Sequence, residues 1–241
     1  MSNLFWLSDA QMERLKPFFP KSHGKPRVDD LRVLSGIIFI NRNGLRWRDA
    51  PKEYGPAKTL YNRWKRWSDN GVFARIMLGL AAESAEHKTI MIDATYLKAH
   101  RTASSLRVKK GGRPRQIGRT KGGMNTKLHA VVDAKGRPLG FYMSAGQVSD
   151  YTGAAALLSG LPKAEWLLAD RGYDADWFRD ALKDKGINVC IPGRKSRKEA
   201  VKYDKRRYKR RNRIEIMFGR LKDWRRVATR YDRRPETFFS A

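Results

Sequence analysis

Cysteine is nearly missing from this chain, with Cys190 alone among 241 residues. A single cysteine excludes an intrachain disulfide and a zinc site built from several cysteines. It stands in the apolar run INVCI, where we expect a buried structural thiol. No apolar run reaches the length of a membrane span, and the opening MSNLFWLSDAQ lacks the basic region and long apolar core of a signal peptide. We therefore expect a cytoplasmic, nucleoid-associated protein with no membrane partner.

Acidic residues are also scarce, with 24 Asp and Glu against 52 Lys and Arg, a net charge of +28. Two stretches hold most of the excess. Residues 98–121 contain nine basic and no acidic residues, and residues 194–234 contain nineteen basic and five acidic ones. Such clustering indicates a surface that follows nucleic-acid phosphates with salt-dependent affinity. The alternative is an unusually basic solubilising surface.

Apolar residues are not scarce, at 41 %, and the length allows one large domain plus a small one. We expect residues 1–85 to form a small helical domain. Ser8 and Gln11 have the spacing of a capping box. A second helix is predicted over 29–41, with Gly44 as its stop.

A third helix is predicted over 59–67, with one aromatic side and one basic side. The domain is either a helix-turn-helix-like DNA-binding module or a packing and dimerisation module. In the first case Arg63 and Arg66 would contact DNA.

Residues 86–241 alternate between strand and helix patterns, which predicts an α/β protein with a mixed sheet flanked by helices. Between two predicted strands lies a basic, glycine-rich loop over 98–125. We expect Lys109, Lys110 and Arg113 in this loop to contact DNA. Its KKGG and TKGG segments do not match a P-loop, so no nucleotide cofactor is expected.

Two predicted strands, IMID and WLLAD, each end on an aspartate, Asp93 and Asp170. If the strands are neighbours in a sheet, the two carboxylates lie side by side and raise each other's pKa. Mg²⁺ relieves that conflict because it takes oxygen ligands and keeps open positions for water and phosphate. A third carboxylate, Glu215, would complete a site for two metal ions suited to in-line displacement at a phosphodiester.

Glu215 lies in the segment YKRRNRIEIMFGRLK with Tyr208, Arg211 and Lys222. At about 100° per residue of α-helix, these four side chains share one face. A separate apolar stripe would seat the helix on a core.

Each carboxylate also has a simpler explanation. Asp93 and Asp170 are common residue types in turns, and Glu215 with Arg211 fits an ordinary i,i+4 helix pair. Asp150 fits an N-cap better than a fourth metal ligand. His129 alternates with apolar residues, which is typical of a packed histidine.

The chain resembles the DDE transposases of bacterial insertion sequences that carry the signature Y-(2)-R-(3)-E-(6)-K. That signature reads here as Tyr208, Arg211, Glu215 and Lys222. The blocks IDAT, KLHAVVDAKGRPL and ADRGYDAD also match, and the likeness covers about residues 4–241.

The resemblance implies a ribonuclease-H-like catalytic core in which Asp93, Asp170 and Glu215 bind two Mg²⁺ ions, with Mn²⁺ as a substitute. It implies hydrolytic cleavage at the terminal inverted repeats of the element, attack of the freed 3′-OH on target DNA, and a homodimer in the active complex. By position, Tyr208, Arg211 and Lys222 would contact DNA near the cleavage site.

Members of this group commonly continue past RYDRRPETFFSA with an apolar segment, whereas this sequence stops at Ala241. A copy that stops there is expected to fold similarly and to cleave or dimerise less well. Two rival functions stay open. One is a plain nuclease with the same chemistry, and the other is a non-catalytic DNA- or RNA-binding protein that uses the Arg-rich helix as a phosphate clamp.

Overall fold

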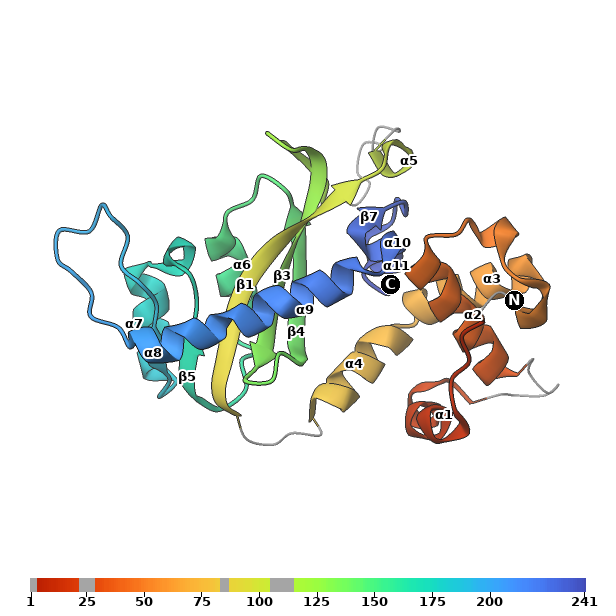
Figure 1. Cartoon of the computed structure of the whole chain (residues 1–241), viewed down its shortest axis with the longest axis horizontal. Coiled ribbons are helices and arrows are strands. Elements are labelled where there is room, and N and C mark those ends of the chain that lie inside the picture. Colours follow the sequence, from red (N-terminus) through yellow and green to blue (C-terminus); the bar gives the residue numbers. More distant parts are fainter. Residues whose placement is uncertain (1–3, 22–28, 83–86, 105–114) are drawn as a thin grey trace. The chain divides into compact units, whose positions relative to one another are not determined.

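The computed structural model describes residues 4–21, 29–82, 87–104 and 115–241. The chain divides into two compact units, each with its own core (Figure 1). The first comprises residues 1–77, 100–107 and 222–241, and the second comprises 78–99 and 108–221. Residues 222–241 thus group by spatial contact with the helical unit. The division into domains of residues 1–85 and 86–241 stays a prediction.

The first unit is helical, as the sequence predicted. Its elements are α1 (Asp9–Leu15), η1 (Lys16–Phe18), α2 (Asp30–Asn43), η2 (Trp47–Asp49), η3 (Lys52–Tyr54), α3 (Ala57–Asp69), the start of α4 (Val72–Ala82), α5 (Arg101–Ser104), α10 (Arg225–Ala228), β7 (Thr229–Arg230) and α11 (Pro235–Phe238). The capping box of Ser8 and Gln11 is confirmed, because both of its hydrogen bonds are present. Gly44 ends α2 at a φ of 72°, which favours glycine.

Aromatic side chains of α3 fill the core of this unit. Trp64 and Trp67 are fully buried and pack with Ile37 and Ile40 of α2. The aromatic side predicted for the third helix is therefore confirmed. No helix among the described residues has both the length and the apolar character needed to cross a bilayer.

The second unit is built on a mixed sheet. Its strands are β1 (His87–Ala99), β2 (Gly118–Thr120), β3 (Gly123–Asp133), β4 (Pro138–Ala145), β5 (Ala164–Leu168) and β6 (Asn188–Cys190). Its helices after β4 are α6 (Asp150–Leu158), η4 (Arg171–Tyr173), α7 (Asp176–Asp184), α8 (Lys205–Tyr208), η5 (Lys209–Arg211) and α9 (Asn212–Lys222).

The strand order identifies the fold. β4, β3 and β1 form an antiparallel meander, and β5 and then β6 extend it in parallel beyond β1. The hairpin between β3 and β4 turns where the sequence predicted, at Gly136 with a φ of 82°. Three antiparallel strands followed by two parallel ones, with helices in the connections, is the ribonuclease-H-like arrangement, so the expected fold class is confirmed.

Opposite faces of the sheet carry different helices. Ile90 and Ile92 of β1 point into a core formed with α6 and α7. Ile191, which follows Cys190 at the end of β6, belongs to the same core. Because side chains alternate along a strand, Met91 and Asp93 point to the other face. Figure 1 shows α9 running across the strands, and it buries Ile214, Met217 and Phe218. Asp93 therefore faces the helix that carries the signature residues.

The signature segment is not one uniform α-helix. A 3-10 turn over Lys209–Arg211 separates α8 from α9. A 3-10 turn rotates about 120° per residue rather than about 100°. The angular spacing expected between Tyr208 and Arg211 from an ideal α-helix is therefore not kept, whereas Arg211 and Glu215 stay paired at i,i+4.

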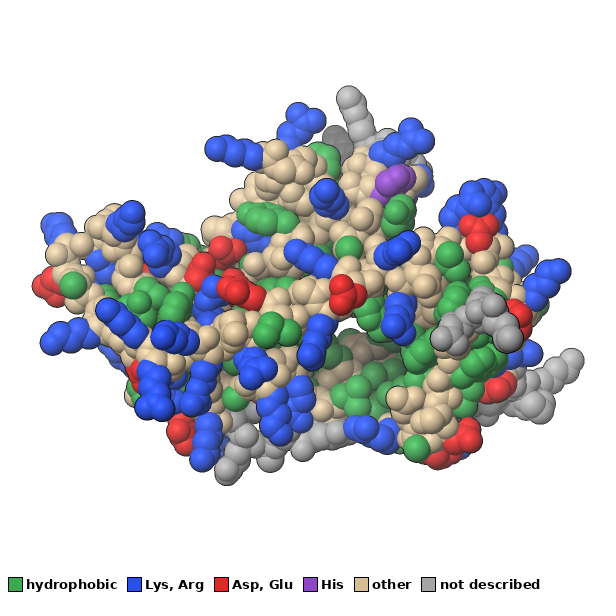
Figure 2. Space-filling view, in the orientation of Figure 1, with side chains coloured by type: hydrophobic (Ala, Val, Ile, Leu, Met, Phe, Trp, Pro, Cys, Tyr) green, Lys and Arg blue, Asp and Glu red, His purple; other side chains and the backbone are tan. Residues whose placement is uncertain are grey.

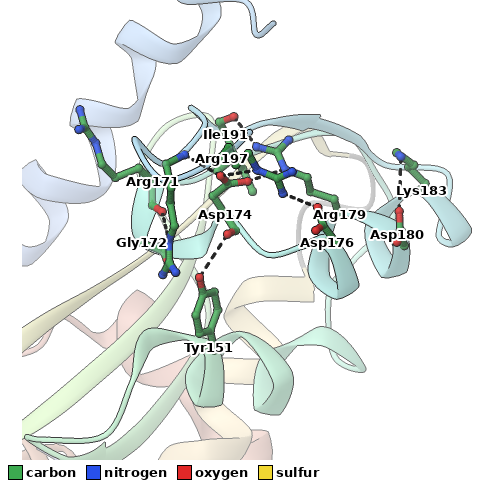
Figure 3. Close-up of polar contacts among 11 residues, drawn as sticks. Tyr151, Arg171, Gly172, Asp174, Asp176, Arg179, Asp180, Lys183, Ile191 and Arg197 are labelled. Atoms are coloured by element: carbon green, nitrogen blue, oxygen red, sulfur yellow. Dashed lines mark hydrogen bonds and ion pairs between the residues drawn. The ribbon is translucent and has the colours of Figure 1, made fainter. Parts of the chain in front are cut away.

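A buried aspartate fixes the basic loop that follows β6. Figure 3 shows Arg179 and Arg197 directed at the Asp174 carboxylate, with Nε–O distances of 2.8 and 2.7 Å. The Arg194 amide donates a third hydrogen bond to it at 2.7 Å. Burial acts to raise the pKa of Asp174, but these hydrogen bonds outweigh it and lower the pKa to about 2. The loop thus depends on one ionised carboxylate.

Replacing Asp174 by Asn is expected to destabilise the protein at pH 7 by about 2 kcal/mol. The folded pKa lies below the unfolded one, so this contribution is present above about pH 4 and is lost as the pH falls toward 2. Denaturant unfolding at pH 7 and pH 3 measures the difference between variant and wild type, which should shrink at pH 3. Asp180→Asn, at an exposed position on α7, is the control. An equal difference at both pH values would contradict the role given to Asp174.

Candidate active site

The two aspartates lie on neighbouring strands. Asp170 follows the end of β5 as expected, but Asp93 does not end its strand, because β1 continues to Ala99. β1 and β5 pair in parallel with Met91 opposite Leu168, so Asp93 and Asp170 follow at the same distance along each strand. The Asp93 side chain is 17 % exposed. Asp170 caps η4, and its Oδ1 accepts a hydrogen bond of 2.8 Å from the Gly172 amide. The turn at Asp170 and the sheet-edge placement are both confirmed, which means that the two explanations of Asp170 hold together.

Asp93 has an unusual electrostatic environment. Burial raises the pKa of Asp93 to about 6, and the charge of Asp170 acts in the same direction. A hydrogen bond from the Ala94 amide at 2.8 Å and the charge of Arg211 oppose the rise without cancelling it. Asp93 is therefore harder to ionise than an ordinary aspartate, and added positive charge at the site would favour its ionised form.

Arg211 joins the third carboxylate to the first. Its Nη1 donates to Asp93 Oδ2 at 2.7 Å, and its Nη2 donates to Glu215 Oε1 at 2.5 Å. The guanidinium is 16 % exposed, whereas Glu215 is 56 % exposed. One cation thus spans the gap between β1 and α9, and it holds a carboxylate on each side.

No group of three His, Cys, Asp or Glu side chains in the described ranges is arranged to hold a metal ion. Asp93 and Glu215 have Arg211 between them instead. The donors nevertheless suit a hard divalent cation, because all are carboxylate oxygens and Asp93 gains from added positive charge. Asp93, Asp170 and Glu215 are the residues that could bind such an ion once Arg211 moves aside.

Of the other signature residues, Tyr208 lies beside Arg211. The Tyr208 ring packs edge-on against Tyr203, with 5.4 Å between centroids, and lies 5.8 Å from the Arg211 guanidinium carbon. Lys222 is exposed at the last position of α9. Figure 2 shows Lys and Arg side chains gathered along α8 and α9 with a few acidic side chains among them. The surface over this helix is therefore strongly basic.

Of the other residues expected at DNA, Arg66 is exposed on α3. Arg63 is not. It is buried, pairs with Asp30 at 2.5 Å and lies 5.2 Å over the Trp67 ring. The expectation that Arg63 contacts DNA therefore does not fit, because its charge is used inside the helical unit. Lys109, Lys110 and Arg113 lie outside the described residues.

Sequence reasoning missed Lys127 and misassigned Asp150. The N-cap of α6 is Ser149, and Asp150 begins the helix and pairs with Lys127 at 3.0 Å. Lys127 has only 7 % of its side chain exposed. A lysine in an alternating, largely apolar strand was the available signal, because a buried ammonium needs an anion nearby. His129 is packed as predicted, fully buried with Nε2 at 2.9 Å from Ser144 Oγ.

A ribonuclease-H-like sheet with one aspartate on its first core strand and another just past the neighbouring parallel strand is characteristic of the DDE class of catalytic domains. The chain belongs to the family described as "Transposase DDE domain", whose model matches residues 84–239. Residues 7–77 match a second model, "Putative transposase of IS4/5 family". The family suggested by the signature is thereby confirmed.

Relatives support this assignment. The chain is 40 % identical over 111 residues to the "Putative transposase for insertion sequence element IS6501" of Brucella ovis. The aligned segment covers 46 % of this chain and 85 % of that protein. It is 30 % identical over 141 residues to the "Putative transposase for insertion sequence element IS402" of Burkholderia cepacia, covering 51 % and 64 %.

Among solved structures, the chain is distantly similar to the piggyBac transposase in its synaptic complex with hairpin DNA. The TM-score is 0.42 with 8 % identity, over 78 % of this chain and 48 % of that one. The chain thus spans about half the length of that protein, and the fold assignment stands on the strand order.

Replacing Asp93 by Asn is expected to stabilise the metal-free protein above pH 6 by about 2 kcal/mol. The folded pKa of Asp93 lies above its ordinary value, so wild type loses stability as the pH rises from about 4 through 6. Urea unfolding in EDTA at pH 5 and pH 8 measures this, and the variant should lose less between them. Asp184→Asn, at an exposed position on α7, serves as control. Identical pH dependence in Asp93→Asn and wild type would refute the account of this carboxylate.

Proposed function

We propose that this chain is an insertion-sequence transposase that binds the ends of its element, cleaves DNA by metal-dependent hydrolysis and transfers the freed 3′-OH end to target DNA. The observation that carries the proposal is Asp93 and Asp170 on neighbouring strands, with Arg211 pairing both Asp93 and Glu215, in a member of the DDE transposase family. Relatives named as insertion-sequence transposases support the choice over a plain nuclease.

Asp93, Asp170 and Glu215 would hold Mg²⁺, with Mn²⁺ as a substitute. Bound between them, divalent ions would supply activation of the attacking oxygen and stabilisation of the leaving oxygen. The neighbouring positions of Asp93 and Asp170 support this assignment, as does the raised pKa of Asp93, which marks a shortage of positive charge.

Arg211 has two uses in this proposal. In the absence of metal it neutralises Asp93 and Glu215. When metal neutralises them instead, the guanidinium becomes available for a DNA phosphate, for which its planar fork is well suited. Its position beside Tyr208 and on the same segment as Lys222 favours a shared path for one DNA strand.

The proposed partner is double-stranded DNA, at the terminal inverted repeats of the element and at the target. The basic residues of 194–213, gathered on the loop after β6 and on α8 and η5, support it. A homodimer in the active complex would hold the two element ends together. The helical unit, with Arg66 exposed, is the proposed sequence-reading or dimerising module.

Replacing Glu215 by Gln should abolish cleavage of DNA that carries an element end and leave binding of that DNA within about twofold, because the amide removes only one ligand charge. Cleavage in Mg²⁺ and Mn²⁺ is followed on labelled duplex, and binding by fluorescence anisotropy. Glu13→Gln, on an exposed helix of the first unit, is the matched control and should cut like wild type. Equal cleavage by Glu215→Gln and wild type would remove Glu215 from the site.

Replacing Arg211 by Gln should lower the thermal stability of the metal-free protein and increase its stabilisation by Mg²⁺. The variant loses the cation that competes for Asp93 and Glu215, so we expect the Mg²⁺ midpoint to fall about tenfold, which corresponds to ~1.4 kcal/mol. Thermal unfolding over a Mg²⁺ series measures both effects. Arg210→Gln, at the exposed neighbouring position, should match wild type. A Mg²⁺ midpoint that is unchanged or higher in Arg211→Gln would show that metal and guanidinium do not compete.

A further inference from the structure

Three residues beside the carboxylate cluster have no role in the proposed chemistry: Lys127, Asp150 and Tyr173. We propose that Asp150, positioned by Lys127, and the Tyr173 hydroxyl bind the water shell of the divalent cation held by Asp93 and Asp170. They are positioning residues and not ligands or catalysts. The proposal rests on the proposed function, because it assumes a metal ion at those two aspartates.

Lys127 fixes one oxygen of Asp150. Its Nζ donates to Asp150 Oδ1 at 3.0 Å and to the Val148 carbonyl at 2.6 Å, and it lies 5.1 Å over the Tyr96 ring. A lysine that is 93 % buried is costly to keep charged unless such partners are present. The lysine is buried, but the side chain of its partner Asp150 is still 34 % exposed. The ammonium thus holds the carboxylate at a set position at the edge of the site.

The other oxygen of Asp150 lies near Gly172, and so does the carboxylate of Asp170. Asp150 Oδ2 lies 3.5 Å, and Asp170 Oδ1 2.8 Å, from the place where a Cβ on residue 172 would be. Gly172 has no Cβ, so both carboxylates can approach the same stretch of backbone. A side chain at position 172 would force the Asp170 carboxylate to shift, whereas Asp150 would stay in ordinary contact. The glycine in DRGYD therefore allows Asp170 its present position beside Asp150.

The hydroxyl of Tyr173 is an independent observation that points to a bound water or ion at this place. The Tyr173 side chain is fully buried, and its hydroxyl has no hydrogen-bond partner among the residues that the structure describes. Burial raises the pKa of this hydroxyl, the charges of the three acids Asp150, Asp93 and Asp170 act in the same direction, and the charge of Arg211 opposes them. Buried hydroxyl groups are nearly always satisfied. A hydroxyl left without a partner next to three carboxylates is explained by water that these acids and a cation would hold in place.

The geometry favours the water shell over direct ligation. Asp150 already neutralises Lys127 through Oδ1, which weakens it as a metal ligand. Mg²⁺ keeps several of its waters when a protein binds it. Those waters are strong donors, and Asp150 Oδ2 is a suitable acceptor. Outer-shell groups of this kind orient the ligands and change metal affinity about 10–100-fold when they are removed.

The test uses the full chain and Mg²⁺ alone. We expect Tyr173→Phe and Asp150→Asn each to raise the Mg²⁺ concentration for half-maximal thermal stabilisation about tenfold. Tyr173→Phe keeps the buried ring and removes only the unpaired hydroxyl, so its metal-free unfolding temperature should equal or exceed that of wild type. Tyr142→Phe, a half-buried tyrosine on β4, is the matched control and should leave the Mg²⁺ midpoint unchanged.

The outcomes separate this proposal from the proposed function. If both variants keep the wild-type Mg²⁺ midpoint while Glu215→Gln loses cleavage, the metal chemistry stands and the role of Asp150 and Tyr173 is refuted. If Asp150→Asn lowers only the metal-free stability and Tyr173→Phe changes nothing, the pair with Lys127 is structural and the proposal fails. If wild type shows neither Mg²⁺-dependent stabilisation nor cleavage, both proposals fall.

Discussion

The guanidinium of Arg211 is the contact on which the second unit's site depends. It is the group that places α9 over β1 at Asp93 while also pairing with Glu215 on its own helix. The apolar stripe of α9 seats the helix on the sheet, but packing alone does not choose which polar residues meet. A charge-assisted fork with fixed geometry does choose, because it fits two carboxylates at once. The Arg211 side chain therefore contributes both to the position of α9 on the sheet and to the charge balance of the site.

Buried polar groups in unfavourable surroundings lie where the chemistry is proposed to occur. Asp93 remains partly buried at a pKa of about 6, and Tyr173 keeps a hydroxyl without a hydrogen-bond partner in the described part of the chain. Asp174, only four residues past Asp170, shows the opposite arrangement, with three donors on one carboxylate and a pKa of about 2. Acids close to one another thus have different roles. Asp174 has all its hydrogen bonds within the protein and fixes a loop, whereas Asp93 and Asp170 are proposed to bind a metal ion.

Local patterns predicted the parts that depend on neighbours in sequence. The turn at Asp170 just past β5, the hairpin at Gly136 and the capping box at Ser8 follow from short-range rules, and the structure has all three. The strand end expected at Asp93 is wrong, because β1 stays paired with β3 and continues to Ala99. The errors involve distant partners. Arg63 is buried because Asp30, 33 residues earlier, lies beside it, and helical periodicity carries no information about that. Lys127 and Asp150 likewise meet across 23 residues through the sheet. The Arg211–Asp93 contact spans 118 residues, so spacing on the helix predicted a shared face with Glu215 but not the strand that it would reach.

The solitary thiol has a practical consequence for work on this molecule. Cys190 is buried at the end of β6, and burial raises its pKa, so it is mostly protonated and slow to react near neutral pH. We therefore expect the native chain to react only slowly with maleimides. A single cysteine introduced at an exposed position such as Arg210 or Glu13 would carry a fluorophore or spin label without removal of any native residue. The position of DNA along α8 and α9 could then be mapped by distance measurements on a protein that is otherwise unaltered.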